Sequence, residues 1–177
     1  MKLKNTRLTI ISGIAALCLG TGAMAQGSTS AQDKTFVKKA SQGSLAEVEL
    51  GKLALQKSKN DDVRTFAQKM VDDHTKLMGD MKPFADKMGV PQPKTVNAEQ
   101  KATMTKLRAK SGKAFDEAYV KDMVEDHHKD LKEFDSEINS TQNSDLKSTV
   151  TSGRDVVKMH SDMIEGIAGK MNISTSM

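Results

Sequence analysis

The sequence predicts an all-α fold, a bundle of four long helices. Apolar residues recur at three- and four-residue spacing along most of the chain, and no stretch shows the alternation of a half-buried strand. Aromatic residues, which strands and nucleic-acid stacking surfaces favour, make up only 3% of the 177 residues. The polar breaks between the helical stretches are short, long and short, which is typical of two helical hairpins joined by a long connection.

Residues 1–25 are predicted to be a secretory signal peptide, which takes no part in the fold. Three cations precede an apolar stretch, Leu8–Leu19, that is too short to span a bilayer. The small residues that end at Ala25 suit cleavage before Gln26. We therefore expect a periplasmic or secreted protein that keeps no transmembrane anchor after cleavage.

Cleavage changes the composition of the protein. The leader holds three basic residues and no acidic ones, so its removal lowers the formal net charge from +4 to +1. The remaining lysines alternate with acids along the chain, so no nucleic-acid partner is expected. Cys18, the only cysteine, leaves with the leader, so the mature chain can form no disulfide and do no thiol chemistry.

The mature chain begins with a flexible lead-in, residues 26–32, and the bundle domain is predicted over residues 33–168. The first helix is expected over Asp33–Ser58, with Asp33 as its N-cap. The second is expected over Asp61–Met88, with a kink or break at Pro83 because proline lacks the amide donor. The two are separated by a short Asn-Asp-Asp break.

Residues 89–111 form the longest connection, and Ala98–Ala109 within it is predicted to be a short helix. The third long helix is expected over Gly112–Asn139 and the fourth over Asp145–Ala168, followed by a flexible tail, residues 169–177. The long connection can cross the whole bundle, as in ferritin-like folds, or loop locally. The direction of the third helix relative to the second therefore stays open.

Each apolar stripe has one polar interruption, namely Glu47, His74, His127 and His160. Counted from the hairpin turns at a rise of about 1.5 Å per residue, the two members of each hairpin differ in depth by only about 5–6 Å. The four side chains are thus predicted to meet in one layer. Imidazoles with a carboxylate suit one transition-metal ion, Zn, Cu, Fe or Ni.

Two other interpretations of these residues remain. A Glu/His hydrogen-bond network would compensate the buried polar groups without any metal. Thioethers of Met70, Met81 and Met123 on the same stripes would favour Cu(I), although methionine is more often a core filler. Asp73 and Asp126, which precede two of the histidines, are candidate hydrogen-bond acceptors for a ligand on a neighbouring helix.

Two segments of the form Met-Val-x-Asp-His end at His74 and His127, each preceded by an aromatic residue four positions before the methionine. With the stretch Glu47–Ala54, they resemble the exported bacterial family known as domain of unknown function 4142, over residues 33–168. The resemblance implies a ferritin-like four-helix bundle, usually periplasmic, with no established activity. It also matches His160 to a histidine of the fourth helix.

A di-iron centre of the ferritin type is not expected. Such a centre needs Glu-x-x-His on two helices, whereas Val71, Val124 and Val157 stand three positions before the histidines. One metal ion with four protein ligands would serve metal handling or redox protection, and would favour binding over catalysis. The alternatives are a metal-free envelope stress or interaction protein, and a small metal-dependent oxidoreductase with one labile ligand.

Overall fold

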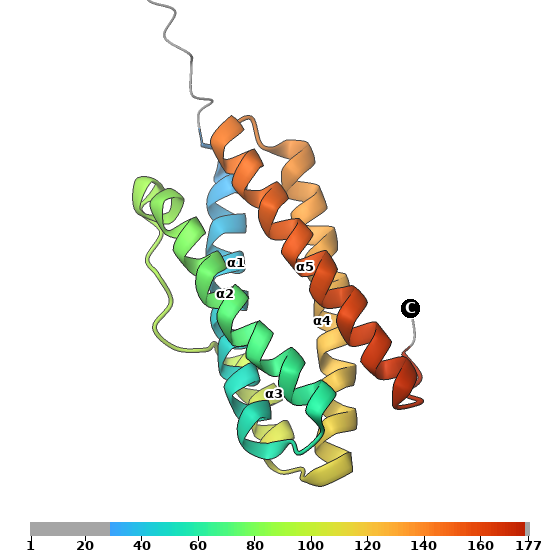
Figure 1. Ribbon diagram of the computed structural model, residues 1–177. Coiled ribbons are helices and arrows are strands. Elements are labelled where there is room, and N and C mark those ends of the chain that lie inside the picture. The colour runs from blue at the N-terminus through green and yellow to red at the C-terminus, as the bar shows by residue number, and fades with distance from the viewer. Residues whose placement is uncertain (1–28, 176–177) are drawn as a thin grey trace, which may run out of the picture.

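The computed structural model describes residues 29–175, so the predicted signal peptide lies outside the described residues. The described part of the chain forms five helices and no strand (Figure 1). They are α1 (Ala31–Lys57), α2 (Asp61–Met88), α3 (Ala98–Arg108), α4 (Gly112–Ser140) and α5 (Ser144–Lys170). The four long helices and the short α3 match the predicted elements to within two residues at each end. The prediction of an all-α bundle is confirmed.

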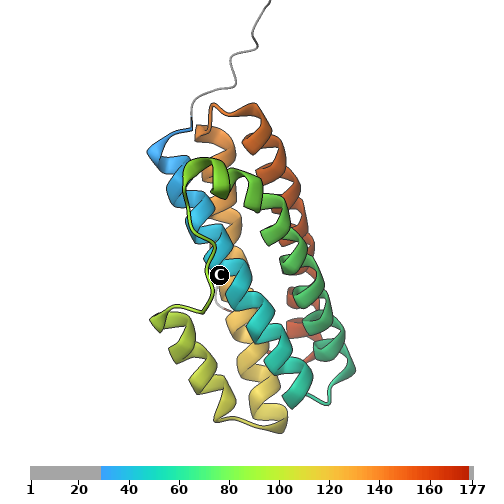
Figure 2. The ribbon, with the colours of Figure 1, turned by 90° about the vertical axis from the view of Figure 1, so that its left-hand side faces the viewer.

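The bundle consists of two hairpins, α1 with α2 and α4 with α5, and α2 also packs on α5 as α1 does on α4. The connection after α2 runs back beside α1 for part of the bundle, and α3 continues to the end where α4 starts (Figure 2). As a result α4 starts at the same end as α2 and runs in the same direction (Figure 1). The ferritin-like arrangement of two hairpins and a long crossover with a short helix is therefore present, with α2 and α4 on one diagonal.

The helix ends follow from local hydrogen bonds. Ser30, and not the expected Asp33, is the N-cap of α1. Asp33 is the third residue of a capping box, and its carboxylate accepts from the Ser30 amide at 2.9 Å. The α2 helix continues through Pro83 instead of breaking there, and ends at Gly89, whose φ of 67° suits glycine.

The apolar core is divided into two clusters. One cluster, which we call the lower core, surrounds Phe66 and Tyr119 near the α1–α2 turn. The other, the upper core, surrounds Phe36 and Phe134 near the α4–α5 turn. Between them, every long helix contributes polar residues, and these form one layer across the bundle. The buried polar residues of this middle section are Ser41, Ser44, Glu47, His74, His127, His160 and Ser161.

Candidate metal centre

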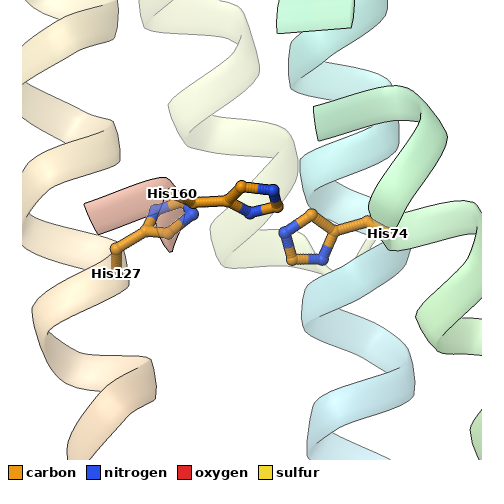
Figure 3. A group of neighbouring side chains, drawn as sticks. All are labelled: His74, His127 and His160. Atoms are coloured by element: carbon orange, nitrogen blue, oxygen red, sulfur yellow. The ribbon is translucent and has the colours of Figure 1, made fainter. Parts of the chain in front are cut away.

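The structure brings His74 on α2, His127 on α4 and His160 on α5 together in the middle of the bundle (Figure 3). All three are at most 2% exposed. One ligand nitrogen from each ring lies within 4.8 Å of the others, and the ring centroids are 5.3 to 6.2 Å apart. We call these three residues the histidine triad.

The parallel course of α2 and α4 explains why one sequence motif serves twice. Both helices start at the same end of the bundle, and His74 and His127 lie 13 and 15 residues after their first residues, Asp61 and Gly112. These similar spacings place both imidazoles at nearly the same depth, since two residues correspond to about 3 Å along a helix. The aromatic residue that precedes each histidine by eight positions packs below the layer, where the Phe66 and Tyr119 rings are 6.3 Å apart.

Each ring of the triad uses one nitrogen to contact the protein and leaves the other free. His127 Nδ1 donates to the Met123 carbonyl at 2.8 Å, and His160 Nε2 donates to Asp73 Oδ2 at 2.8 Å. His74 Nδ1 lies 3.4 Å from Ser44 Oγ. The remaining nitrogens, Nε2 of His74, Nε2 of His127 and Nδ1 of His160, are buried and have no hydrogen-bond partner.

These contacts suit the neutral form of the three imidazole rings. Because a carbonyl and a carboxylate only accept, they hold the proton of His127 on Nδ1 and that of His160 on Nε2, so the free nitrogens carry lone pairs. Burial lowers the pKa of His127 to about 4, and nearby His160 contributes. Burial also lowers the pKa of His160, although Asp73 acts in the opposite direction, and it lowers that of His74 well below its usual value.

Glu47, the fourth predicted ligand, is fully buried but does not join the triad. The α1 residue that reaches the histidines is Ser44, one helical turn earlier. The hairpin turn centred on residue 59 explains this, since Ser44 lies 15 residues before it and His74 lies 15 residues after it. The depth difference of about 5 Å between Glu47 and His74 is therefore enough to separate them.

The carboxyl group of Glu47 faces α4 instead. Neither of its oxygens has a hydrogen-bond partner. Burial raises its pKa well above the ordinary value, and the charges of Asp126, Asp130 and Asp122 raise it further. The protonated form is thus favoured, and Asp126 is its main charged neighbour. Of the two aspartates that precede histidines, Asp73 contacts the triad and Asp126 faces Glu47.

The donor set fits a transition-metal ion. Three imidazole nitrogens are a common ligand set for such ions, and bonds of about 2.1 Å in tetrahedral geometry need nitrogens about 3.4 Å apart. The upper limit of 4.8 Å in the structure is wider than this, so small ring rotations would close the triad. Among residues 29–175 no further His, Cys, Asp or Glu joins the triad, so one coordination position would remain for a solvent-sized ligand.

The other candidate donors lie elsewhere. Met70 and Met123 belong to the lower core and Met81 to the upper core, so their thioethers serve in packing. His128, the histidine next to the triad, points away from it and contacts Glu165 on α5. Sequence reasoning missed Ser44 and the Met123 carbonyl. Ser44 could have been found by the depth count from the turn, whereas a backbone acceptor leaves no signal in the sequence.

A comparison with known sequences places this chain in a family. The profile of the domain of unknown function DUF4142 matches residues 19–167. The chain belongs to the DUF4142 family. The resemblance noted in the sequence is thereby confirmed, and no curated protein matches this DUF4142 chain.

Among solved structures, the DUF4142 bundle is similar to a DUF305 protein from Streptomyces coelicolor that is predicted to be secreted. The two are 15% identical, with a TM-score of 0.70 over 84% of this chain and 98% of the other. This likeness concerns the fold. Within residues 29–175, the helices are all too short or too polar to cross a membrane.

Proposed function

We propose that the protein binds one transition-metal ion through His74, His127 and His160, in the periplasm, and serves in metal handling or redox protection. The proposal is carried by three buried histidines that each place a ring nitrogen within 4.8 Å of the others and each have one nitrogen without a hydrogen-bond partner. Leaving a buried polar nitrogen unsatisfied costs about 1–3 kcal/mol. A metal ion would compensate all three at once.

The surroundings of the rings support the same proposal. Metal-binding histidines usually donate their second N–H to a carboxylate, a carbonyl or another acceptor, which fixes the ring and its tautomer. Asp73, the Met123 carbonyl and Ser44 stand at these positions. Neutral rings are also the form that binds metal, and burial favours that form in all three.

The metal-free alternative, a buried Glu/His network, has less support. Such a network needs Glu47 to pair with a histidine, yet both of its oxygens lack a partner and its nearest charged neighbours are aspartates of α4. Without an ion, the middle layer would thus keep several buried groups unpaired. A role in envelope stress or interaction would have to rest on other parts of the surface.

The open coordination position favours a second candidate function. An oxidoreductase that uses a metal needs such a position for its substrate. The hollow beside His74 has a volume of about 20 Å³, enough for about one water molecule. Only a substrate of very few atoms would fit, so any turnover would concern small oxygen species. Activity that is lost when the metal is removed would support this candidate.

Metal analysis of protein purified from the periplasm tests the main proposal. We expect one equivalent of a transition metal per chain, and loss of stoichiometric binding in His74→Ala and His127→Ala. His128→Ala is the matched control, because this ring lies outside the triad, contacts Glu165 and should leave the metal content unchanged.

Titration of the metal-free protein completes the test. Addition of Co²⁺ should produce the absorbance of a tetrahedral site with histidine ligands. Absence of stoichiometric metal, combined with no thermal shift on adding Zn²⁺, Cu²⁺, Fe²⁺ or Ni²⁺, would sink the proposal.

A further inference from the structure

A small hollow lies between α1 and α4, beside His74 of the histidine triad. Its volume is about 20 Å³, and its lining includes Ser44 and His74 at the buried end. At the other end it is lined by Asp130, Glu133 and Lys39, of which the Lys39 side chain is 60% exposed. The hollow thus connects a charged part of the surface with the layer of the core that contains the free ring nitrogens.

The outer end of the hollow opens into a larger groove. This groove has a volume of about 670 Å³ and shares Lys39, Gly43, Asp130 and Glu133 with the hollow. Four acidic residues of α4 at successive turns line it, Asp122, Asp126, Asp130 and Glu133, together with lysines from α1 and α4. Burial, with Asp126 as the main charged neighbour, raises the pKa of Asp130 to about 7 and that of Asp122 to about 6. Carboxylates crowded in this way gain from the approach of a cation.

We propose that this hollow is the entry route for the metal ion of the histidine triad. Asp130 and Glu133 hold the ion first, and the space beside Gly43 lets it pass to His74. The inference rests on the proposed function and extends it by assigning residues to the loading step. It assigns no second site, because among the described residues only the triad gathers three ligand atoms within 4.8 Å.

The absence of a side chain at Gly43 supports an entry route better than it supports a simple packing defect. It lies inside α1, where glycine is less favourable than alanine by about 0.5–1 kcal/mol. A Cβ atom at this position would meet nothing within 4 Å, so close packing does not require glycine there. The absent side chain instead leaves the space that both the hollow and the groove border.

The size and chemistry of the hollow suit a partly dehydrated ion. Room for about one water molecule excludes a fully hydrated cation, so carboxylate oxygens must replace part of its water shell before it enters. Asp130 and Glu133 are placed to do so. Lys39 Nζ lies 3.3 Å from Glu133 Oε1. A surface ion pair of this kind contributes at most about 1 kcal/mol to stability. An arriving cation can therefore displace the lysine.

The test measures Co²⁺ binding to the metal-free mature protein by stopped-flow absorbance, with dissociation followed after addition of a chelator. Gly43→Leu should lower both the association and the dissociation rate at least about tenfold and leave Kd unchanged within about threefold, because a blocked route alters the barrier and not the site. Gly79→Leu is the matched control, since Gly79 is another helical glycine with open space around it.

Charge variants provide a second line of evidence that does not depend on Gly43→Leu folding well. The double variant Asp130→Asn/Glu133→Gln should slow association about tenfold or more, and Lys39→Gln should accelerate it. Glu117→Gln, on the same helix but outside the groove, should leave the rate unchanged.

The outcomes separate the two proposals. If Co²⁺ binds with unchanged rates in Gly43→Leu and in the double variant, the route is wrong and the metal site stands. If Gly43→Leu weakens Kd through faster dissociation, the residue shapes the site and the route is again wrong. If the unaltered protein binds no Co²⁺, the proposed function falls, and the route falls with it.

Discussion

At the scale of single residues, the orientation of each imidazole is set by a neighbour that binds no metal itself. Asp73 is the clearest case, because its carboxylate accepts from His160 Nε2 while also pairing with Lys69 at 2.9 Å. Although burial acts in the opposite direction, hydrogen bonds from His160 and Lys69 lower the pKa of Asp73. The carboxylate therefore stays ionised and holds the proton of His160 on Nε2, which leaves a lone pair on Nδ1.

Replacement of this acceptor should weaken metal binding without removing a ligand. Asp73→Asn is expected to lower the affinity for Co²⁺ or Zn²⁺ by about 10–100-fold, because an amide accepts more weakly and no longer fixes the ring. Competitive titration against a chelator measures the change. Asp72→Asn is the control, since that carboxylate contacts only Gln68 on its own helix. Equal affinities in the two variants would refute the role of Asp73.

A second residue-scale feature is a carboxyl pair far from the triad. Asp33 and Glu137 are both 1% exposed and lie side by side, where the start of α1 meets the end of α4. Burial, with the nearby Asp33, raises the pKa of Glu137 to about 7. Burial also pushes the pKa of Asp33 upward, but hydrogen bonds from Ser30 and Glu137 outweigh it and hold that pKa below its usual value. At mildly acidic pH, Glu137 is therefore the protonated partner.

This pair predicts a definite pH dependence of stability. The folded state holds the Glu137 proton up to a pH of about 7, whereas the unfolded chain loses it near its usual value of about 4.5. Its contribution is complete below about 4.5 and is lost as the pH rises to about 7. Glu137→Gln should remove this loss and make the protein more stable than the parent at pH 8, by about 2 kcal/mol.

Urea denaturation at pH 5 and pH 8 measures the effect. The quantity compared is the difference in unfolding free energy between the two pH values, in the parent and in the variant. Glu117→Gln on the surface of α4 is the control and should keep the parental difference. A Glu137→Gln protein with the same pH dependence as the parent would contradict the assignment.

At the scale of elements, the α1–α2 hairpin is held by an unusually close approach at Gly51. A Cβ at this position would lie 2.8 Å from the Ala67 carbonyl oxygen and 2.9 Å from Val71 Cγ2. The first of these atoms belongs to the backbone and cannot move aside like a flexible side chain. The glycine thus sets how closely the two helices pack below the histidine triad, and with that the position of His74 on α2.

Gly51→Ala should therefore be destabilising, by about 1–3 kcal/mol, although alanine is the better helix former. Gly79→Ala tests the effect of helix propensity alone, because a Cβ there meets nothing within 4 Å. This variant should stabilise the protein by about 0.5–1 kcal/mol. Urea denaturation of both variants measures the contrast. Two changes of the same sign would show that the close approach does not matter.

At the scale of the whole molecule, the triad joins three of the four long helices. His74, His127 and His160 come from α2, α4 and α5, so they link both hairpins, whereas α1 contacts the triad through Ser44. An ion bound here would connect parts of the chain that are 86 residues apart in sequence. Binding to the folded state alone also shifts the folding equilibrium by mass action.

Metal should consequently raise the thermal stability. At free metal about 1,000 times Kd, the folded state gains about 4 kcal/mol. For a domain of this size, that gain corresponds to an increase in Tm of about 10 °C. Differential scanning calorimetry with and without Zn²⁺ measures it, and His127→Ala should abolish the shift while His128→Ala keeps it. A shift that persists in His127→Ala would place the binding elsewhere.

The sequence predicts the helices and the inward placement of three histidines, but not which residue of α1 lies beside them. Periodicity shows which residues share a stripe, so three histidines within apolar stripes were predicted to face the interior. It does not show how far along the bundle axis each residue lies. The choice of Glu47 instead of Ser44 is an error of one helical turn along that axis. Serine also lacks the ligand chemistry of histidine or glutamate, so a serine in a helix stripe is not marked by its residue type.

The remaining features depend on contacts that no local pattern encodes. The hydrogen bond from His160 to Asp73 spans 87 residues, and the space at Gly43 exists only once α1 lies against α4. The course of the long connection was also open from the sequence, because a chain of that length can either cross the bundle or loop locally. Packing of α2 beside α5 and of α1 beside α4 decides it.

The division of the core into two apolar clusters has a consequence for how the molecule opens. The polar layer interrupts side-chain packing between the ends, so without an ion each end can loosen as its own cooperative unit. A bound ion would tie the units together from the inside. If the proposed ion is bound, its loss would then lower the cooperativity of unfolding along the whole length of the bundle.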